Sequence, residues 1–357
     1  MRIALIADTH YGIRNDSVVF YDYMKLSNDY FFSHLEKNGI NQIVHLGDLY
    51  DRKKYINYVT SYRCRTDFLD RIENNKKLKM DVIAGNHDTY HKNTNEINSL
   101  NELVRGYKSI TVHTGPTEVN YDVPILLLPW ICADNYDESI SAINRTPANI
   151  ALGHLELNGF ETSKGVVHHG GMESGVLSKF GLVCSGHFHH KSTIGNINYL
   201  GAAYEFSWAD WNDPRGFTIL DTDTMRLEFI QNPYRLFHML AYDDVNNLDA
   251  IKEDIDERDF SVYEKSYVKI VAVNRKDPTL FERYMDKIYK AGANDITVVE
   301  DANLFTDDST EELISDGEDT ITLFNRYIDG INVNVNPSKL KNYIKTIYME
   351  AEALEKS

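Results

Sequence analysis

The chain has 357 residues, with 37 Lys and Arg against 54 Asp and Glu, and its net charge of −17 excludes a basic protein that coats nucleic acid non-specifically. Hydrophobic residues at 42% and charged residues at 25% exclude a wholly disordered chain. The three cysteines form no CxxC pair, and the start of the chain does not resemble a signal peptide. No apolar run is long enough to span a membrane. We therefore expect a cytoplasmic globular protein without membrane association.

The first 200 residues repeat one local pattern, in which a short apolar run ends in a polar residue able to bind a metal. The runs are RIALIAD, QIVHLGD, MDVIAGN, NIALGH and LVCSGH, ending at Asp8, Asp48, Asn86, His154 and His187. Such continuous apolar runs predict strands buried on both faces. Helical spacing over residues 18–37 and 59–74 predicts α/β layering. We therefore expect the five run ends to meet at one edge of layered sheets, where open α/β folds bind ligands.

The pattern changes after about residue 232. Residues 266–274 predict a strand, 279–290 a helix and 295–299 a second strand, which together form a small α+β unit. Residues 300–319 contain nine Asp and Glu and no Lys or Arg, which is typical of a solvated linker. A helical pattern around 321–328 and another from 336 onward follow; the second has an apolar stripe made of Leu340, Tyr343, Ile344, Ile347, Ala351 and Leu354.

The run ends and their neighbours supply seven oxygen and imidazole donors and no thiolate: Asp8, His10, Asp48, Asn86, His154, His187 and His189. This donor set suits manganese, iron or zinc. Residues two apart on a strand face the same side, so Asp8 with His10, and His187 with His189, could each serve one centre. Seven donors are too many for one ion but suffice for two that share a bridging carboxylate. A lone DxH or GxH is weak evidence, but all five segments in this order predict a dinuclear metal site.

The segments DTH (8–10), GDLYD (47–51), GNHD (85–88), GH (153–154) and GHFH (186–189) resemble the signature of the calcineurin-like metallophosphoesterases. The resemblance is greater to one branch, the double-strand-break-repair nuclease subunits typified by bacterial SbcD and the T-even phage recombination nuclease. Additional similarity lies in LPW (128–130), HLELNGF (154–160), YLG (199–201) and DPRGF (213–217). The motifs cover roughly residues 1–220.

The resemblance implies a four-layer α/β/β/α metallophosphoesterase core, a small α+β cap domain and a C-terminal helical segment. We accordingly expect a nuclease core over residues 1–238, a DNA-binding cap over 239–300, an acidic linker over 301–319 and a C-terminal helical segment over 320–357. By the same resemblance, the last segment docks on a partner ATPase.

The resemblance also assigns roles to the donors. Asp8, His10, Asp48 and His189 would hold the first metal, and Asp48 would bridge to a second that Asn86, His154 and His187 complete. The two ions would be divalent, with Mn²⁺ favoured and Mg²⁺ as the alternative. His87 would contact the scissile phosphate and assist the leaving oxygen, with Asp88 orienting it. Other members commonly carry His at the position of Asp51, so the role of Asp51 stays open.

The implied function is a DNA nuclease of recombination and repair that hydrolyses phosphodiesters with two metals, as a 3′-to-5′ exonuclease on duplex ends and an endonuclease on single strands. The implied partners are DNA, an SbcC-type SMC-like ABC ATPase and a second copy in a homodimer, in the host cytoplasm if the chain is phage-encoded. The alternatives are a calcineurin-like phosphatase or cyclic-nucleotide phosphodiesterase on the same site, and a non-enzymatic scaffold for the ATPase. GNHD rather than GNHE at 85–88 disfavours a phosphoprotein phosphatase.

A basic segment begins directly after the GDLYD motif. Residues 52–79 contain nine Lys and Arg and three Asp and Glu, a net charge of +6. Arg52, Lys53 and Lys54 are therefore candidates for contacts with DNA phosphates; the alternative is a solvated helix face. Most of the 23 tyrosines recur at helical or strand spacing, and we expect them in the core or at its rim.

Overall fold

A computed structural model of the chain describes residues 1–300 and Lys341. The expected acidic linker (301–319) and, apart from Lys341, the expected C-terminal helical segment (320–357) lie outside the described residues. Among the helices of the described part, none combines the length and the apolar character needed to span a bilayer.

The first sheet has six strands in the order β16-β15-β1-β2-β3-β6. β1, β2, β3 and β6 are parallel, and β15 and β16 extend the sheet antiparallel from β1. The three apolar runs at the N-terminus form its central strands, as predicted. The bounds are β1 (Arg2–Ile6), β2 (Gln42–His45), β3 (Lys79–Ile83), β6 (Ile110–His113), β15 (Gly216–Asp221) and β16 (Arg226–Gln231).

The second sheet also has six strands, in the order β13-β14-β12-β9-β8-β7. Its four central strands β14, β12, β9 and β8 are parallel, and the apolar runs that end at His154 and His187 form β9 and β12. The bounds are β7 (Thr117–Asn120), β8 (Pro124–Leu128), β9 (Ile150–His154), β12 (Leu182–Gly186), β13 (Ser192–Ile194) and β14 (Ile197–Tyr199). Two small hairpins, β4 (Thr89–His91) with β5 (Thr94–Asn98) and β10 (Glu161–Ser163) with β11 (Val166–Val167), lie outside both sheets.

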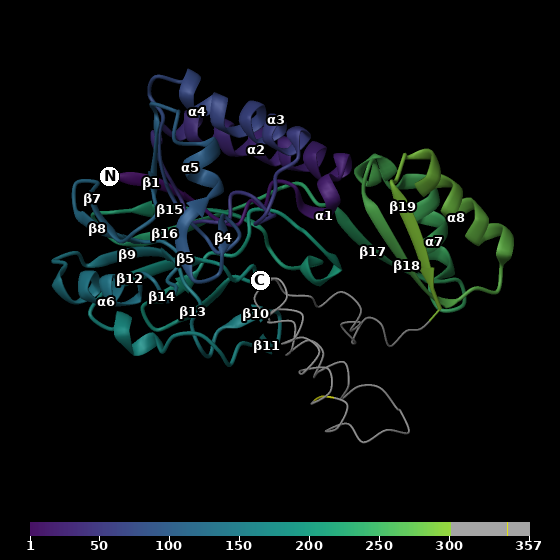
Figure 1. The fold of residues 1–357 in the computed structure, drawn as a ribbon. Coiled ribbons are helices and arrows are strands. Elements are labelled where there is room, and N and C mark those ends of the chain that lie inside the picture. Colours follow the sequence, from purple (N-terminus) through teal and green to yellow (C-terminus); the bar gives the residue numbers. More distant parts are fainter. Residues whose placement is uncertain (301–340, 342–357) are drawn as a thin grey trace. The chain divides into compact units, whose positions relative to one another are not determined.

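The two sheets pack face to face between two layers of helices (Figure 1). Ile3 and Leu5 of β1 point into the core between the sheets, whereas Ala4 and Ile6 point to the helix side, because successive strand residues face opposite ways. Helices α2 (Val18–Asn38), α3 (Tyr58–Cys64), α4 (Asp70–Asn74) and α5 (Ser99–Leu103) cover the first sheet, and α6 (Tyr136–Arg145) covers the second. The four-layer α/β/β/α fold is therefore confirmed.

The helix predicted over 59–74 is interrupted. It consists of α3, a π-helical turn over Arg65–Leu69, and α4. Thr60, Cys64 and Phe68 recur at fourth positions and are buried, so this face packs against the core while the opposite face is exposed. Near it lies the short turn α1 (Ile13–Asp16), in which Arg14, Asn15 and Asp16 have positive φ angles of 52°, 56° and 61°.

A third sheet contains three parallel strands, β17 (Phe237–Asp243), β18 (Tyr267–Asn274) and β19 (Asp295–Val299). Its helices α7 (Leu248–Glu257) and α8 (Pro278–Lys290) share one apolar core with the strands. The predicted strands at 266–274 and 295–299 and the helix at 279–290 are confirmed within one residue, and the side chain of Asp277 caps α8. β17 begins two residues before the expected boundary at 239, and a DNA-binding role for this unit stays a prediction.

Candidate metal centre

The fold brings all seven predicted donors together at the carboxyl ends of the central strands of both sheets. Asp8 and His10 follow β1, Asp48 follows β2 and Asn86 follows β3, while His154 ends β9 and His187 and His189 follow β12. Six of the seven are buried and His189 is half-buried.

The backbone at these positions is unusual. Asp8, His10, Asp48 and His187 have positive φ angles of 52°, 42°, 55° and 88°, a region that costs free energy for any residue except glycine. These turns redirect the chain directly after each strand. Gly85, which directly precedes Asn86, lies against Asp48. A Cβ atom at this position would collide with the Asp48 carboxylate, so the close packing of the two segments requires glycine. Strained conformations held at four of seven donors indicate a site built for their side chains.

The first donor group contains Asp8, His10, Asp48 and His189. Nε2 of His10 lies 3.1 Å from Nε2 of His189 and 3.7 Å from Oδ2 of Asp48. Asp8, His10 and His189 each offer one donor atom within 4.8 Å of the others. The Asp8 carboxylate also accepts hydrogen bonds from the His187 amide at 3.0 and 3.2 Å, which tie the ends of β1 and β12 together.

The second donor group contains Asp48, Asn86, His154 and His187. Nε2 of His154 lies 2.9 Å from Oδ1 of Asn86 and 3.3 Å from Oδ2 of Asp48. Nδ1 of His187 lies 2.9 Å from the same Asn86 oxygen. Oδ2 of Asp48 therefore lies near His10 in one group and near His154 in the other, where a bridging carboxylate belongs.

These distances fit divalent ions. Donors bound to one ion at about 2.0–2.2 Å lie about 3–3.4 Å apart, which matches most of the separations in each group. Nε2 of His10 and Nε2 of His189 face each other although at most one hydrogen fits between them, and Nε2 of His10 also lies near the Asp48 carboxylate. The donor chemistry and the spacing both suit two cations that share Asp48.

Burial makes the carboxylates of the site unfavourable as isolated charges. Burial, reinforced by the nearby Asp48 carboxylate and opposed by His154, raises the pKa of Asp8 to about 7 and that of Asp88 to about 6. Burial opposes a charge on His154, but the Asp48 carboxylate raises its pKa to about 9. A site this rich in buried negative charge favours a bound cation.

Hydrogen bonds behind the donors fix their orientation. Nδ1 of His154 donates to the Leu46 carbonyl at 2.7 Å, which leaves Nε2 to face the site. Oδ1 of Asp51 lies 3.4 Å from Nδ1 of His10, an ion-pair contact on the side of that ring away from Nε2. The buried guanidinium of Arg215 donates to the carbonyl of His189. Arg215 belongs to the DPRGF segment, whose contribution to the site the sequence did not reveal.

His87 lies beside the first donor group, with its ring centroid 4.8 Å from that of His10. Its Nδ1 lies 2.5 Å from the carbonyl oxygen of Asp51, and its buried Nε2 has no hydrogen-bond partner among the described residues. His87, His10 and Asp48 also form a group of potential metal ligands, so the geometry alone leaves His87 two roles.

Asp88 differs from the expectation that it orients His87. Its Oδ2 accepts from the backbone amides of Asp48 at 2.8 Å and Gly85 at 3.0 Å, and its Oδ1 accepts from that of Tyr50 at 3.2 Å. Asp88 thus holds the loop that carries Asp48, whereas the Asp51 carbonyl orients the His87 ring. The two roles are divided in this way because the Asp88 side chain points towards the loop after β2 and not towards the His87 ring.

The predicted phosphate contacts are placed unequally. Arg52 is half-buried and donates to Asp16 at 3.0 Å and to Asn15 at 2.9 Å, so its charge is largely balanced. Lys53 is half-buried and Lys54 is exposed. The sequence also did not reveal Phe206, whose ring lies 5.4 Å from His10 and 5.3 Å from His189 and walls the first donor group. Phe206 belongs to no motif, because a single large apolar residue in a loop does not stand out in the sequence.

Comparison with known proteins shows which family the chain resembles. Residues 1–191 match the calcineurin-like phosphoesterase family. The chain is 31% identical to exonuclease subunit 1 of Enterobacteria phage T4, over 98% of this chain and 99% of the phage protein. It is 27% identical to the D subunit of nuclease SbcCD from Staphylococcus epidermidis, over 64% of this chain and 67% of that protein. A solved archaeal phosphodiesterase aligns with 65% of this chain and 99% of its own at 13% identity, with a TM-score of 0.35.

The chain belongs to the calcineurin-like phosphoesterase family, in the branch of SbcD-type nuclease subunits. The predicted family and a phosphodiester-hydrolysing activity are thereby confirmed, and the family implies divalent metals at the donor groups described above.

Proposed function

We propose that this phosphoesterase is a DNA nuclease that hydrolyses phosphodiester bonds with two divalent ions, as a 3′-to-5′ exonuclease on duplex ends and an endonuclease on single strands. The observation that carries the proposal is the single oxygen of Asp48 placed between two groups of buried donors. The naming of two similar proteins as an exonuclease subunit and a nuclease subunit supports DNA as the substrate.

Asp8, His10, Asp48 and His189 would hold one ion, and Asp48, Asn86, His154 and His187 the other. We propose Mn²⁺, with Mg²⁺ as the alternative, because the five side chains other than Asp8 and Asp48 are nitrogen or amide donors and no thiolate is present. Two bound ions would supply charge stabilisation for the phosphate and an acidified water molecule.

The chain itself supplies orientation and a proton. The Asp51 carbonyl accepts a hydrogen bond from Nδ1 of His87, so Nε2 is the nitrogen presented to a substrate. A proton held on Nε2 would pass to the leaving 3′ oxygen when the phosphodiester bond breaks. Phe206 and Trp130 wall the two donor groups with aromatic rings and limit the access of bulk water.

A test of the activity compares four substrates with Mn²⁺ and with Mg²⁺. End-labelled linear duplex DNA reports polarity, single-stranded circular DNA reports endonuclease activity, and para-nitrophenyl phosphate and a cyclic nucleotide report the alternative enzyme classes. We expect cleavage of both DNA substrates at rates that exceed those on the small molecules. Efficient hydrolysis of only the small substrates would favour the phosphatase or cyclic-nucleotide phosphodiesterase, and no hydrolysis at all would favour the scaffold.

We further propose that the protein acts as a homodimer with an SbcC-type SMC-like ABC ATPase, bound through the C-terminal segment 320–357, in a reducing cytoplasm. The similar proteins are named as subunits, which supports a partner, and the buried cysteines Cys64, Cys132 and Cys184 are all free. Deletion of residues 335–357 should abolish co-purification with the ATPase but preserve Mn²⁺-dependent cleavage of single strands. If the truncated protein still binds the ATPase, the docking segment lies elsewhere.

A further inference from the structure

Arg215 is a buried arginine that pairs with two buried carboxylates. Its side chain is 5% exposed, and its Nη2 donates to Oδ1 of Asp210 and lies 3.1 Å from Oδ2 of Asp213. We call these three residues the arginine triad. Burial opposes the charge on Arg215, but the two carboxylates outweigh it and raise the pKa of the guanidinium above its usual value. Buried ion groups are often no more stable than apolar residues of similar size, so stability alone does not account for the triad.

The other terminal nitrogen of Arg215 reaches the metal centre from behind. Nη1 donates to the backbone carbonyl of His189, which also accepts from the Ala202 amide at 3.0 Å. The next residue is held as well, because Nδ1 of His190 lies 2.8 Å from Oδ2 of Asp213. The triad therefore fixes two successive residues of the loop after β12.

We propose that Arg215 is a positioning residue of the metal centre, which fixes the backbone of His189 and thereby places its imidazole in the first donor group. The proposal rests on the proposed ligand set and adds to it a residue that binds neither the ion nor the substrate. His189 depends on such support because it is half-buried, whereas the other six donors are buried. Side-chain packing restrains it less, so bonds to its backbone matter more.

Arg215 is not placed to bind a phosphate of the substrate. An arginine that binds phosphate presents a free edge of its guanidinium to the ligand. Here Nη1 is occupied by the His189 carbonyl and Nη2 by the two carboxylates of the triad, and the side chain is almost fully buried. An effect of Arg215 on the site therefore passes through His189.

The triad also holds the aromatic wall of the first donor group. Oδ2 of Asp210 accepts from the amides of Phe206 at 2.6 Å and Ser207 at 3.0 Å. The Phe206 ring lies 5.4 Å from that of His10 and 5.3 Å from that of His189. One buried carboxylate thus connects the residue behind a donor with the ring beside it.

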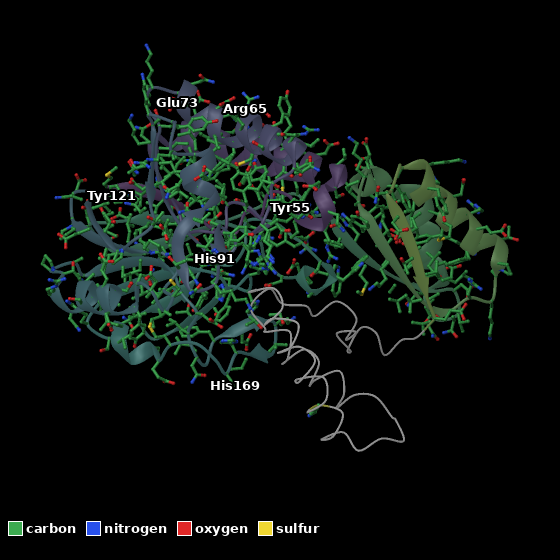
Figure 2. The ribbon with its side chains drawn as sticks, in the orientation of Figure 1. Tyr55, Arg65, Glu73, His91, Tyr121 and His169 are labelled. Carbon is green, nitrogen blue, oxygen red and sulfur yellow. The ribbon has the colours of Figure 1, made fainter. Side chains whose placement is uncertain are left out.

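Neighbouring segments fix the triad in turn. The backbone carbonyl of Arg215 accepts from the Asn232 amide at 2.8 Å. Nε2 of His190 lies 3.3 Å from Oε2 of Glu161 in the β10–β11 hairpin, and Figure 2 labels His169, two residues beyond β11. Contacts from separate segments hold the guanidinium in one place, as support for a precisely placed ligand requires.

The test titrates Mn²⁺ into the metal-free full-length protein and its variants by calorimetry. We expect Arg215→Met to weaken one of the two sites about 10-fold or more and to leave the other unchanged. Arg215→Lys should lose less, because one ammonium group can donate to the carbonyl but not also to both carboxylates. Arg258→Met is the matched control and should weaken neither site, because the partners of Arg258 all lie in the third-sheet unit: Asp254, Tyr263 and Tyr284.

Double-variant cycles identify which site is affected. In a His189→Ala background, Arg215→Met should cause no further loss of Mn²⁺ affinity, because the imidazole that it positions is gone. In a His154→Ala background, which affects the second donor group, Arg215→Met should keep its full effect. A residue that only stabilised the fold would not distinguish between the two backgrounds.

Folding is controlled with a second variant, because removal of one partner from a buried ion group is destabilising. Arg215→Met with Asp210→Asn removes one positive and one negative charge together, and the amide oxygen can still accept from Phe206. Circular dichroism and thermal unfolding of the metal-free proteins show which variants fold. The double variant should fold and lose the same site as Arg215→Met. If neither Met variant folds, Arg215→Lys decides the question, with a loss of about threefold or more expected at the first site.

The outcomes separate this proposal from the proposed ligand set. If His189→Ala binds Mn²⁺ like the wild type, the ligand set is wrong and the proposal falls with it. If His189→Ala loses a site while the folded Arg215 variants bind Mn²⁺ like the wild type, only the positioning role is refuted. Equal weakening of both sites, or a further loss in the His189→Ala background, would make Arg215 a purely structural residue and overturn the proposal.

Discussion

Oδ1 of Asp51 lies 3.4 Å from Nδ1 of His10, on the side of the imidazole opposite to the donor atom Nε2. A carboxylate behind a metal-binding histidine fixes its tautomer and raises its basicity. We therefore predict that Asp51, whose role the family motif left open, orients His10. The structure also separates two contributions of Asp51, since its carboxylate contacts His10 and its carbonyl contacts His87.

Asp51→Ala should lower metal affinity or activity about 10- to 100-fold, because His10 loses its orienting partner while the backbone carbonyl still holds His87. Asp51→Asn should lose less, because the amide oxygen can still accept from Nδ1. Calorimetric titration of Mn²⁺ into the metal-free variants measures the effect directly. Unchanged metal affinity in Asp51→Ala would show that the carboxylate does not position His10.

His87→Ala should abolish strand scission and leave the metal content nearly intact. The reason is that Nε2 of His87 has no hydrogen-bond partner among the described residues and is oriented by the Asp51 carbonyl, as a proton donor to substrate requires. Elemental analysis and cleavage of labelled DNA decide the question. Loss of metal together with activity would instead make His87 a ligand, which its place beside His10 and Asp48 also permits.

Asp48→Ala should lose more metal than Asp8→Ala. Oδ2 of Asp48 lies 3.7 Å from Nε2 of His10 and 3.3 Å from Nε2 of His154, so its removal affects both donor groups, whereas Asp8 belongs to one. Mn²⁺ titration should show two weakened sites in the first variant and one in the second. Equal, single-site losses would indicate that Asp48 does not bridge. Thermal unfolding of both metal-free variants controls for loss of fold.

The sequence predicted the core and the meeting of the seven candidate donors, because both depend on local patterns. Apolar runs that end in Asp8, Asp48 and His187 specify buried strands and the polar turns after them, and parallel strands bring their carboxyl ends to one edge. The roles of Asp51, Asp88 and Arg215 depend on where loops from distant segments meet. Arg215 reaches the carbonyl of His189 from a position 26 residues away in the chain, and no periodicity encodes such a contact.

The exposure of Tyr58 and Tyr62 was harder to predict for a related reason. Tyr58 and Tyr62 recur at the helical spacing of a buried stripe, yet the core takes the face of Thr60, Cys64 and Phe68 instead. Which of two apolar faces of a short helix is buried depends on its neighbours. Here Asp16 and Tyr21 bond to Thr60, and they turn that face inward.

Glu205 provides a pH-dependent test of the junction between the core and the third sheet. The side chain is 2% exposed, and its Oε2 accepts from the amides of Leu236 at 2.7 Å and Phe237 at 3.0 Å. Burial raises the pKa of Glu205 from 4.5 to about 7, an effect that the two amides and Arg235 oppose and Asp210 reinforces. The folded state therefore binds the proton more tightly than the unfolded state does, so this contribution to stability is full below pH 4.5 and is lost as the pH rises through 7.

Glu205→Gln should therefore be more stable than the wild type at pH 8, by up to about 3 kcal/mol, because the amide oxygen still accepts both hydrogen bonds without a buried charge. The two proteins should converge in stability as the pH falls towards 4.5. Glu205→Ala is the control: it leaves two buried amides without an acceptor and should be destabilised by about 1–3 kcal/mol per amide at both pH values. Urea unfolding at pH 5 and pH 8 measures all three proteins. A Gln variant that is no more stable than the wild type at pH 8 would contradict the raised pKa. It would mean that the two amides and Arg235 stabilise the ionised Glu205 carboxylate by more than its burial destabilises it.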